Sequence, residues 1–522
     1  MKKRLILLLF SIALASGLSV QAQMSSSAID SLAVLTLKTF DVPGMAIGVV
    51  HNGKVIHAKG YGVRSLKTMQ PVDENTLFGI ASNSKAFTTT ALAMLADEGK
   101  LHWDDKVRKY IPEFTLYNPF VSEEFTIRDL VTHRSGLGLG AGDLMFFPEG
   151  GDISVQDIIH NLRYLKRESS FRSKYEYNNN LYIVAGEVIR RVSGMHWDTF
   201  IETRLLQPVG MTSSKASYNR VTQRNNIIDA HAPVNGKVEA IPHDWNETAN
   251  AAGGIMSNIT DLSKWVITQL NEGVMSNGNR LVSAKQHREM WTIQTMNPVA
   301  PNGPYQTQFN GYGLGWVISD VKGKKQVGHT GGLIGTVTQI TMIPELKLGI
   351  IVLTNQQSGA AFLSVTNSIK DSYLGYENRD WVGNYNKRMQ QLFADANRIT
   401  DSVYQLSARQ VKLRQSNPLA VVPDSMITGV YHDLKMGEMH ISPNGKQLNI
   451  SFVRSPRLTG TLLPLNATTW IARWNDRSYD ADAYAEFIFD HTGKAQEIKM
   501  KAISPMTDFS FDFHNLELKR RE

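Results

Sequence analysis

Residues 77–95, LFGIASNSKAFTTTALAML, join the apolar end of a strand to a helix and place a serine and a lysine at the junction. Apolar side chains between Phe87 and Leu95 recur at helical spacing, which predicts a helix after the serine. Lys85 follows Ser82 by three positions, so both side chains are expected on one face of this helix, one turn apart. The stretch therefore predicts a hydroxyl and an amine held close together where a helix begins.

This pairing of residue types is suited to nucleophilic catalysis. A serine hydroxyl is a weak nucleophile until a neighbouring base removes its proton. Burial near another cation lowers the pKa of a lysine, and the neutral amine can then act as that base. Free backbone N–H groups at the helix start can face a developing oxyanion. We therefore interpret Ser82 as a candidate nucleophile and Lys85 as its base; the alternative is a capping serine beside a solvated lysine.

The same spacing recurs at Ser319 and Lys322, so the pair alone is weak evidence. The second pair leads into Gly323, in a turn between predicted strands, where no helix would hold the two side chains together. We therefore expect the chemistry at the first pair.

A tyrosine and an amide form a second candidate motif, Tyr177-Asn-Asn179, just before the apolar run 181–189. A phenol or its tyrosinate can relay a proton, and an amide can pin a substrate amide or the lysine. The alternative is a tyrosine that packs in the core before a helix. A rival match, Tyr376-Glu-Asn378, lies beyond the final predicted strand of this part of the chain.

The third candidate motif, His329-Thr-Gly-Gly332, precedes a strand-forming stretch. Glycines beside a site let a substrate backbone approach closely, and the N–H group of Gly332 can complete an oxyanion hole. A rival, His491-Thr-Gly493, sits in a predicted hairpin turn near the C-terminus. Only Ser82, Tyr177 and His329 follow one another in this order with each residue in a suitable local context.

Together the three motifs resemble those of the serine β-lactamase and penicillin-binding protein superfamily. They are Ser82-x-x-Lys85, Tyr177-x-Asn179 and His329-Thr330-Gly331. The tyrosine in the second and the histidine in the third resemble class C β-lactamases and their esterase and D-aminopeptidase relatives. The resemblance covers about residues 28–375, with supporting phrases at 126–137, 252–257 and 312–316.

The resemblance implies an α+β fold, in which a transpeptidase-like antiparallel sheet is flanked by helices and joined by a helical subdomain. It also implies roles for individual residues. Catalysis falls to Ser82, Lys85, Tyr177 and His329, the oxyanion hole to the N–H groups of Ser82 and Gly332, and substrate binding to Asn179, Thr330 and Gly331. No cofactor and no metal are implied.

Two positions depart from the class C pattern. Dedicated class C β-lactamases usually carry a lysine where His329 stands, and that lysine binds the carboxylate of the drug. A histidine there weakens the case for efficient β-lactam hydrolysis. Asn178 is bulkier than the small residue usually found between the tyrosine and the asparagine of the second motif.

Strand patterns lie at both ends of the catalytic segment. Apolar residues 45–50 and 55–58 flank Asn52-Gly53, a pair that favours a hairpin turn. Residues 340–343 and 348–353 are strand-like as well, with a largely helical middle third between. Strands at both ends with helices between them predict a domain whose sheet joins its two ends.

The chain divides into four predicted regions. They are a signal peptide (1–22), a catalytic domain (23–378), a helical linker (379–425) and a C-terminal β-barrel (426–522). The last region consists of short alternating strands around turns, a pattern typical of a small antiparallel barrel, and it resembles the lipocalin-like module of some relatives. We expect this barrel to affect substrate choice or assembly and to leave acylation itself unchanged.

The first residues predict export. Lys2, Lys3 and Arg4 precede an apolar core, and Ala22 offers a small residue for cleavage, which indicates a periplasmic or secreted protein without stable membrane insertion after cleavage. The alternative is an uncleaved membrane anchor, for which the apolar run is short. Without the three basic residues at 2–4 the formal charge falls from +7 to +4, and this surplus is scattered apart from a basic run at 519–521, so no nucleic-acid partner is expected. The chain has no cysteine, which excludes disulfides and thiolate nucleophiles.

These patterns predict an exported serine acyl-transfer enzyme that acts on a small-molecule or peptide acyl substrate. Hydrolysis of small esters or peptide amides is the first hypothesis. Transfer of the acyl group to an alcohol or amine is an alternative, because the same acyl-enzyme serves both reactions. A catalytically silent penicillin-receptor-like binding protein is the alternative from another class. The sequence leaves open whether the chain forms a homo-oligomer.

Overall fold

The first and last strands of the catalytic part lie side by side in one sheet. In the computed structural model, which describes residues 23–242, 247–377, 379–417 and 421–521, β1 (Gly44–His51) pairs antiparallel with β12 (Leu348–Thr354). β1 also pairs with β2 (Lys54–Gly62), and Asn52 and Gly53 between them adopt φ angles of 51° and 73°. These positive angles are those of the tight hairpin turn that an Asn-Gly pair favours. The predicted hairpin and the sheet that joins both ends are therefore confirmed.

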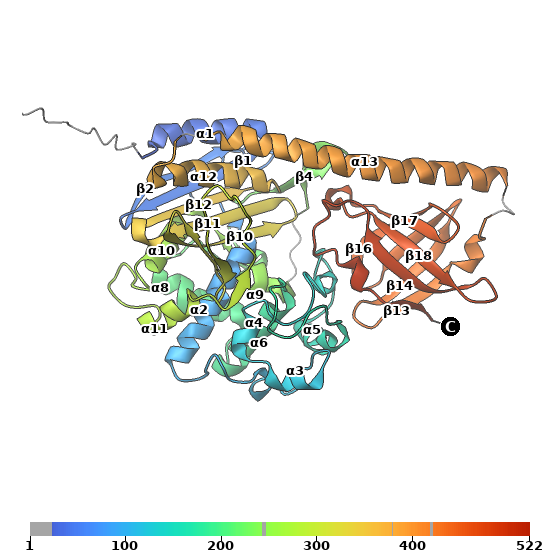
Figure 1. Ribbon diagram of the computed structural model, residues 1–522, viewed down its shortest axis with the longest axis horizontal. Helices are drawn as coiled ribbons and strands as arrows, with labels where there is room; N and C mark the ends of the chain where they lie inside the picture. The colour runs from blue at the N-terminus through green and yellow to red at the C-terminus, as the bar shows by residue number, and fades with distance from the viewer. Residues whose placement is uncertain (1–22, 243–246, 378, 418–420, 522) are drawn as a thin grey trace, which may run out of the picture.

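The central sheet is antiparallel, with strand order β2-β1-β12-β11-β10-β9-β8-β7. Its other strands are β7 (Thr295–Asn297), β8 (Asn310–Tyr312), β9 (Val317–Val321), β10 (Lys324–Leu333) and β11 (Thr336–Ile343). Helices cover both faces of its middle strands, and every residue of β12 is accordingly buried, with an apolar run that ends at Thr354 (Figure 1). The predicted α+β architecture is confirmed.

Alternate residues of β12 enter two different cores. Ile350 and Val352 pack in the core that also contains residues of α1 (Ser26–Thr39) and α12 (Gly359–Leu374). Ile351 and Leu353 belong to the main core on the other face, where α10 (Ile259–Leu270) contributes buried residues. This two-sided packing follows from the alternation of side chains along a strand.

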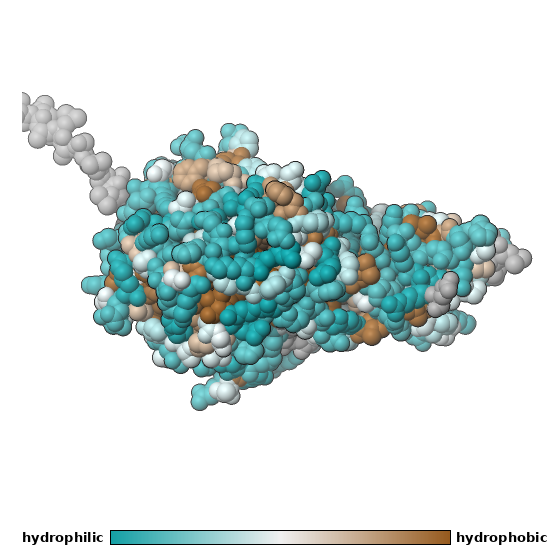
Figure 2. Space-filling view, turned by 90° about the horizontal axis from the view of Figure 1, so that it is seen from below, coloured by the Kyte–Doolittle hydropathy of each residue, from teal (hydrophilic) through white to brown (hydrophobic). Residues whose placement is uncertain are grey.

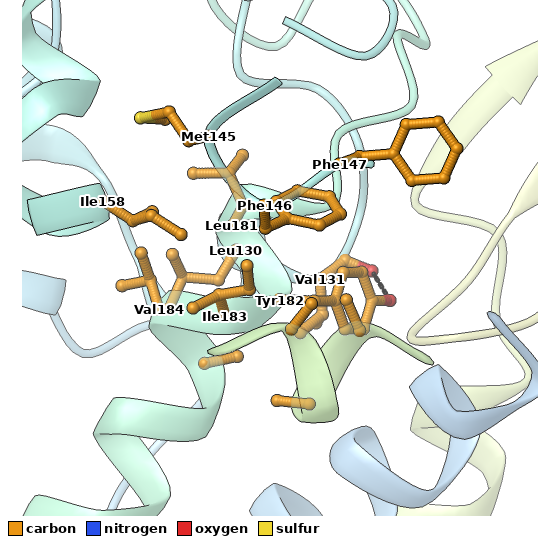
Figure 3. Close-up of a cluster of buried hydrophobic side chains, with 14 of the residues drawn as sticks. Leu130, Val131, Met145, Phe146, Phe147, Ile158, Leu181, Tyr182, Ile183 and Val184 are labelled. Atoms are coloured by element: carbon orange, nitrogen blue, oxygen red, sulfur yellow. Dashed lines mark hydrogen bonds between the residues drawn. The ribbon is translucent and has the colours of Figure 1, made fainter. Parts of the chain in front are cut away.

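A helical subdomain lies beside the sheet and is built around α2 (Ser84–Asp97), which is buried from Ser84 to Leu95. The surrounding helices are α3 (Pro119–Glu124), α4 (Ile127–Leu130), α5 (Val155–Asn161), α6 (Asn180–Ser193), α7 (Trp197–Phe200), α8 (Gln207–Val209), α9 (Asn250–Gly253) and α11 (Ala284–Met290). Figure 3 shows their apolar contact, in which residues of α4, α5 and α6 meet and the hydroxyl of Tyr182 donates to Val131 O at 2.8 Å.

The C-terminal region forms a closed eight-stranded barrel in which each strand pairs with its neighbours in sequence. The strands are β13 (Gly429–Asp433), β14 (Gly437–Asn444), β15 (Gln447–Phe452), β16 (Ser455–Pro464), β17 (Thr469–Trp474), β18 (Ala483–Phe489), β19 (Ala495–Ala502) and β20 (Leu518–Arg520). Pairing of β13 with β20 closes the ring, so no strand edge is left open. Trp470, Trp474 and Phe487 are buried in its core.

One long helix, α13 (Trp381–Ser416), spans the catalytic part and the barrel (Figure 1). At its start, Trp381 donates its indole N–H to Asp371 at 2.7 Å and stacks on Tyr305. Further along, Val403 packs in a small core with Ile471 of the barrel. The helix is therefore anchored at both ends to different parts of the molecule.

The described surface gives no sign of a membrane span. Among the described residues, no helix combines the length and apolar character needed to cross a bilayer. The face in Figure 2 is largely hydrophilic, with hydrophobic residues scattered over it. The predicted signal peptide, residues 1–22, lies outside the described part of the chain.

Glycine at position 331 is required by the packing of β10 against the turn that carries Ser82. A Cβ atom there would lie 2.3 Å from Ile80 O and 2.9 Å from Ala81 Cβ, whereas at Gly332 the nearest atom lies 4.0 Å away. Gly331→Ala should therefore lower the free energy of unfolding by about 1–3 kcal/mol, as overpacking does. Gly332→Ala is the matched control for stability. Equal denaturation midpoints for the two variants would contradict this account.

Candidate active site

Ser82 lies in a short 3₁₀ turn, Ala81–Asn83, that runs directly into α2. The residue before it, Ala81, has a φ of 49°, a left-handed conformation that costs a non-glycine residue about 1–2 kcal/mol. The surrounding sheet supports this turn, because the Thr338 hydroxyl donates to Ile80 O at 3.0 Å. A strained turn held in this way fixes the direction of the Ser82 side chain.

Lys85 is fully buried, and its Nζ atom lies 3.0 Å from Ser82 Oγ. The same Nζ donates to two oxygens, Asn179 Oδ1 at 2.7 Å and the backbone oxygen of Ala252 at 2.8 Å. The charged amine donates to all three oxygens, whereas the neutral amine has two N–H groups and one lone pair, so that with Asn179 and Ala252 as acceptors its lone pair can face the serine hydroxyl. Burial lowers the pKa of Lys85 to about 7, against the opposing effect of the Asp143 charge. Near neutral pH, a large fraction of this lysine can accept a proton.

Tyr177 interacts with Ser82 and lies beside the lysine, with Lys85 Nζ 4.8 Å from the centre of its ring. Burial raises the pKa of Tyr177 well above its ordinary value, and an interaction with Ser82 offsets this only in part. The group is therefore a neutral phenol near pH 7, which can donate a hydrogen. His133 packs against the phenol ring, with ring centroids 4.2 Å apart.

The amides of the second motif have different tasks. Asn179 Nδ2 donates to Asp143 Oδ2 at 2.8 Å, an orientation that leaves the amide oxygen facing the lysine. Asn178 is fully buried, donates through Nδ2 to Ala141 O at 2.9 Å, and accepts from the N–H of Leu181 at 3.2 Å. The Asn178 side chain thus joins the loop at Ala141 to the start of α6 by hydrogen bonds.

His329 lies on β10 and is neutral. Its Nδ1 lies 2.5 Å from Thr330 O and its Nε2 lies 2.9 Å from the Tyr312 hydroxyl. Because a carbonyl oxygen can only accept, Nδ1 carries the hydrogen and Nε2 accepts from the phenol. Burial and the charge of Lys85 lower the pKa of His329 to about 3. The third motif therefore supplies no positive charge at neutral pH.

A cavity of about 1140 Å³ brings the three motifs together. The sequence-predicted residues along its wall are Ser82, Tyr177, Asn179, His329, Thr330 and Gly332. Lys85 is buried behind the serine that it contacts, and Gly331 packs beneath the nucleophile turn. Tyr479, Phe509 and Phe511 of the C-terminal region complete the wall.

Several residues at the site had not been predicted from sequence: His133, Asp143, Tyr312, Ser510 and Asp512. His133 and Tyr312 belong to phrases that carry the family resemblance, so a signal for them was present. Asp143 and Ser510 share a hydrogen bond of 2.9 Å although they stand 367 positions apart in the chain. No local pattern marks either of them.

The rival motifs lie elsewhere. Ser319 is on β9, and Lys322 follows in the turn with a φ of 50°, so this pair has no helix beneath it. His491 lies in the hairpin between β18 and β19 of the barrel. Among the described residues, no group of three or more His, Asp or Glu side chains could hold a metal ion. His243 and Asp244 lie outside those residues.

The chain is similar in sequence to several known proteins. The family model described as Beta-lactamase matches residues 32–372, and a domain of unknown function, DUF3471, matches residues 425–520. The unguisins hydrolase of Aspergillus violaceofuscus is 28% identical over 70% of this chain and 68% of its own length. Protein flp of Staphylococcus aureus is 26% identical over 64% of each chain. The chain thus spans about two thirds of the length of these curated relatives.

Two solved structures have the same fold. The octameric penicillin-binding protein homologue from Pyrococcus abyssi superposes with a TM-score of 0.60 at 23% identity, over 94% of this chain and 99% of the other. A class C β-lactamase superposes with a TM-score of 0.54 at 23% identity, over 68% of this chain and 96% of the other.

The pKa of Lys85 predicts the pH dependence of serine labelling. Only the neutral amine can take the serine proton, so the rate at which a fluorophosphonate labels Ser82 should rise with pH and level off above about 7. His329 and Tyr177 titrate outside this window, because burial lowers the pKa of the first and raises that of the second. Intact-mass measurement of the labelling rate between about pH 5 and 9 tests this. A flat profile would contradict it.

Proposed function

The chain belongs to the β-lactamase family of serine hydrolases, and on that premise we propose that it is an exported enzyme that forms an acyl-enzyme at Ser82. Its substrates are small esters or peptide amides. The observation that carries the proposal is the contact of 3.0 Å between Lys85 Nζ and Ser82 Oγ, with the other two contacts of the amine made to oxygens.

In the proposed first step, neutral Lys85 takes the proton of Ser82 while Oγ attacks the substrate carbonyl carbon. The carbonyl oxygen gains negative charge and accepts from the backbone N–H groups of Ser82 and Gly332. The bond to the leaving alcohol or amine then breaks. Tyr177 hands its hydrogen to the leaving group and recovers one from Lys85, so the lysine is neutral again.

The second step returns the enzyme to its starting state. Water attacks the acyl-enzyme, its proton passes to the Lys85 and Tyr177 pair, and the bond to Ser82 Oγ breaks as the hydroxyl is restored. An alcohol or amine in place of water would give acyl transfer by the same route. Hydrolysis is favoured as the main outcome because a relative that matches 70% of this chain carries the name of a hydrolase.

The many aromatic side chains along the cavity support an acyl group that is largely apolar. Aromatic side chains from both parts of the chain line the cavity: Phe40, Phe146, Phe147, Tyr175, Phe393, Tyr479, Phe509 and Phe511. His329 is neutral where class C β-lactamases usually hold a lysine for the drug carboxylate. The volume of about 1140 Å³ is slightly above the usual range of about 300–1,000 Å³ for small-molecule pockets, which favours a substrate of peptide size.

The decisive variant is Ser82→Ala. Loss of the nucleophile should lower turnover of p-nitrophenyl esters by about three orders of magnitude or more. Ser319→Ala, at the rival pair on β9, is the matched control and should leave turnover unchanged. Equal losses in both variants would show that the wrong serine had been assigned. A stable adduct with fluorescent penicillin, without ester turnover, would instead favour the silent receptor.

Export and assembly are parts of this proposal with their own tests. Cleavage after Ala22 should give a mature protein that begins at Gln23, which N-terminal mass spectrometry of periplasmic and culture fractions would detect. A chain that retains residues 1–22 would overturn the export proposal.

A homo-oligomer is supported by the fold shared with the octameric protein from Pyrococcus abyssi, and light scattering of the purified chain measures it.

A further inference from the structure

The segment between β19 and β20 leaves the barrel and reaches the catalytic part. Ser510 is buried there and donates through Oγ to Asp143 Oδ2 at 2.9 Å. Asp512, two residues on, accepts from the backbone N–H groups of Gly142 at 2.7 Å and Leu144 at 3.0 Å. The barrel therefore holds residues 142–144 by side-chain hydrogen bonds to their backbone and to the one carboxylate among them.

The fit between the two parts is tight around these bonds. A Cβ atom at Gly140 would lie 2.7 Å from the Phe509 ring and 2.8 Å from its backbone oxygen. Phe511 packs edge-on against Phe147, with ring centroids 5.0 Å apart. Phe509 meets the Tyr177 ring in the same manner, at 5.9 Å. The segment is thus part of the wall around the catalytic tyrosine.

A chain of hydrogen bonds continues from Asp143 to the nucleophile. Asp143 Oδ2 accepts from Asn179 Nδ2 at 2.8 Å, Asn179 Oδ1 accepts from Lys85 Nζ at 2.7 Å, and that Nζ contacts Ser82 Oγ. Rotation of the Asn179 amide by half a turn would aim its NH2 group at the lysine and its oxygen at the carboxylate. The amide oxygen would then face Asp143 Oδ2, which already accepts from Ser510, and two accepting oxygens repel each other, so Asp143 determines which way the amide faces.

We propose that the C-terminal barrel completes the catalytic centre: Ser510 and Asp512 hold Asp143, and Asp143 locks Asn179 in the orientation that directs the lone pair of Lys85 at Ser82. The inference rests on the proposed function. Ser510, Asp512 and Asp143 are positioning residues, because none of them touches the reacting atoms. This differs from the sequence-based expectation that the barrel affects only substrate choice or assembly.

A segment that only held the barrel against the catalytic part would not need the buried carboxyl groups of Asp143 and Asp512. Apolar contacts such as that of Phe511 with Phe147 would join the two parts without burying any charge. Instead two carboxyl groups are buried near each other, and burial and mutual repulsion raise the pKa of Asp143 well above its ordinary value, while burial raises that of Asp512 to about 7. An arrangement that disfavours the charged forms is typical of functional sites.

Ser510→Ala tests the link by removing one oxygen. With the full-length protein and a saturating series of fluorophosphonate, the maximal labelling rate should fall by about tenfold, because a misplaced catalytic group lowers the rate without weakening probe binding. The half-saturating probe concentration should stay unchanged. Ser510→Thr keeps the hydroxyl and should restore most of the rate. Ser504→Ala is the matched control, since Ser504 is a buried serine of the same segment that bonds to Asp480 within the barrel.

The outcomes separate this inference from the proposed function. An unlabelled wild type, or equal labelling of Ser82→Ala, overturns the proposed function. A labelled wild type with an unchanged Ser510→Ala overturns the inference alone. So does a raised half-saturating concentration at an unchanged maximal rate, or an equal loss in Ser504→Ala. If Ser510→Ala melts at a lower temperature, Asp512→Asn replaces it, because it removes one of two acceptors for residues 142–144 and should also slow labelling.

Discussion

A fully buried lysine amine is the feature on which the rest of the active site depends. Two of its three contacts are the oxygens of Asn179 and Ala252, and the third is the Ser82 hydroxyl. The fall of its pKa from 10.5 to about 7 corresponds to a cost on the order of 5 kcal/mol for the charged form. That cost keeps a usable base beside the serine at neutral pH. Each neighbouring element can be understood by what it does for this contact.

The sheet and the helices fix the geometry from opposite sides. β10 approaches the nucleophile turn closely enough that only glycine fits at position 331, and it presents Thr330 and Gly332 to the cavity. The start of α6 supplies the amide, and α9 supplies the backbone oxygen of Ala252. The barrel adds an aromatic wall and a serine that bonds to Asp143. Catalytic and C-terminal parts therefore share one site.

The motifs and the hairpin could be predicted because their causes are local. Helical spacing after Ser82 and the turn preference of Asn52-Gly53 act over a few residues, and the fold has both features. The link from Ser510 to Asp143 could not be predicted, because it depends on how a barrel docks on a distant loop. The neutral state of His329 could not be predicted from sequence either, because it follows from burial and from the nearby Lys85. Asn178 was unexplained until its two backbone partners were visible.

Direct titration of the Lys85 side chain measures the central claim without any substrate. Lysine labelled with ¹³C at Cε, with the Lys85 signal assigned by its loss in Lys85→Arg, would report the midpoint by NMR in the folded protein. The account predicts a midpoint near pH 7. A midpoint near the ordinary lysine value of about 10.4 would mean that the amine is charged at neutral pH and cannot be the base.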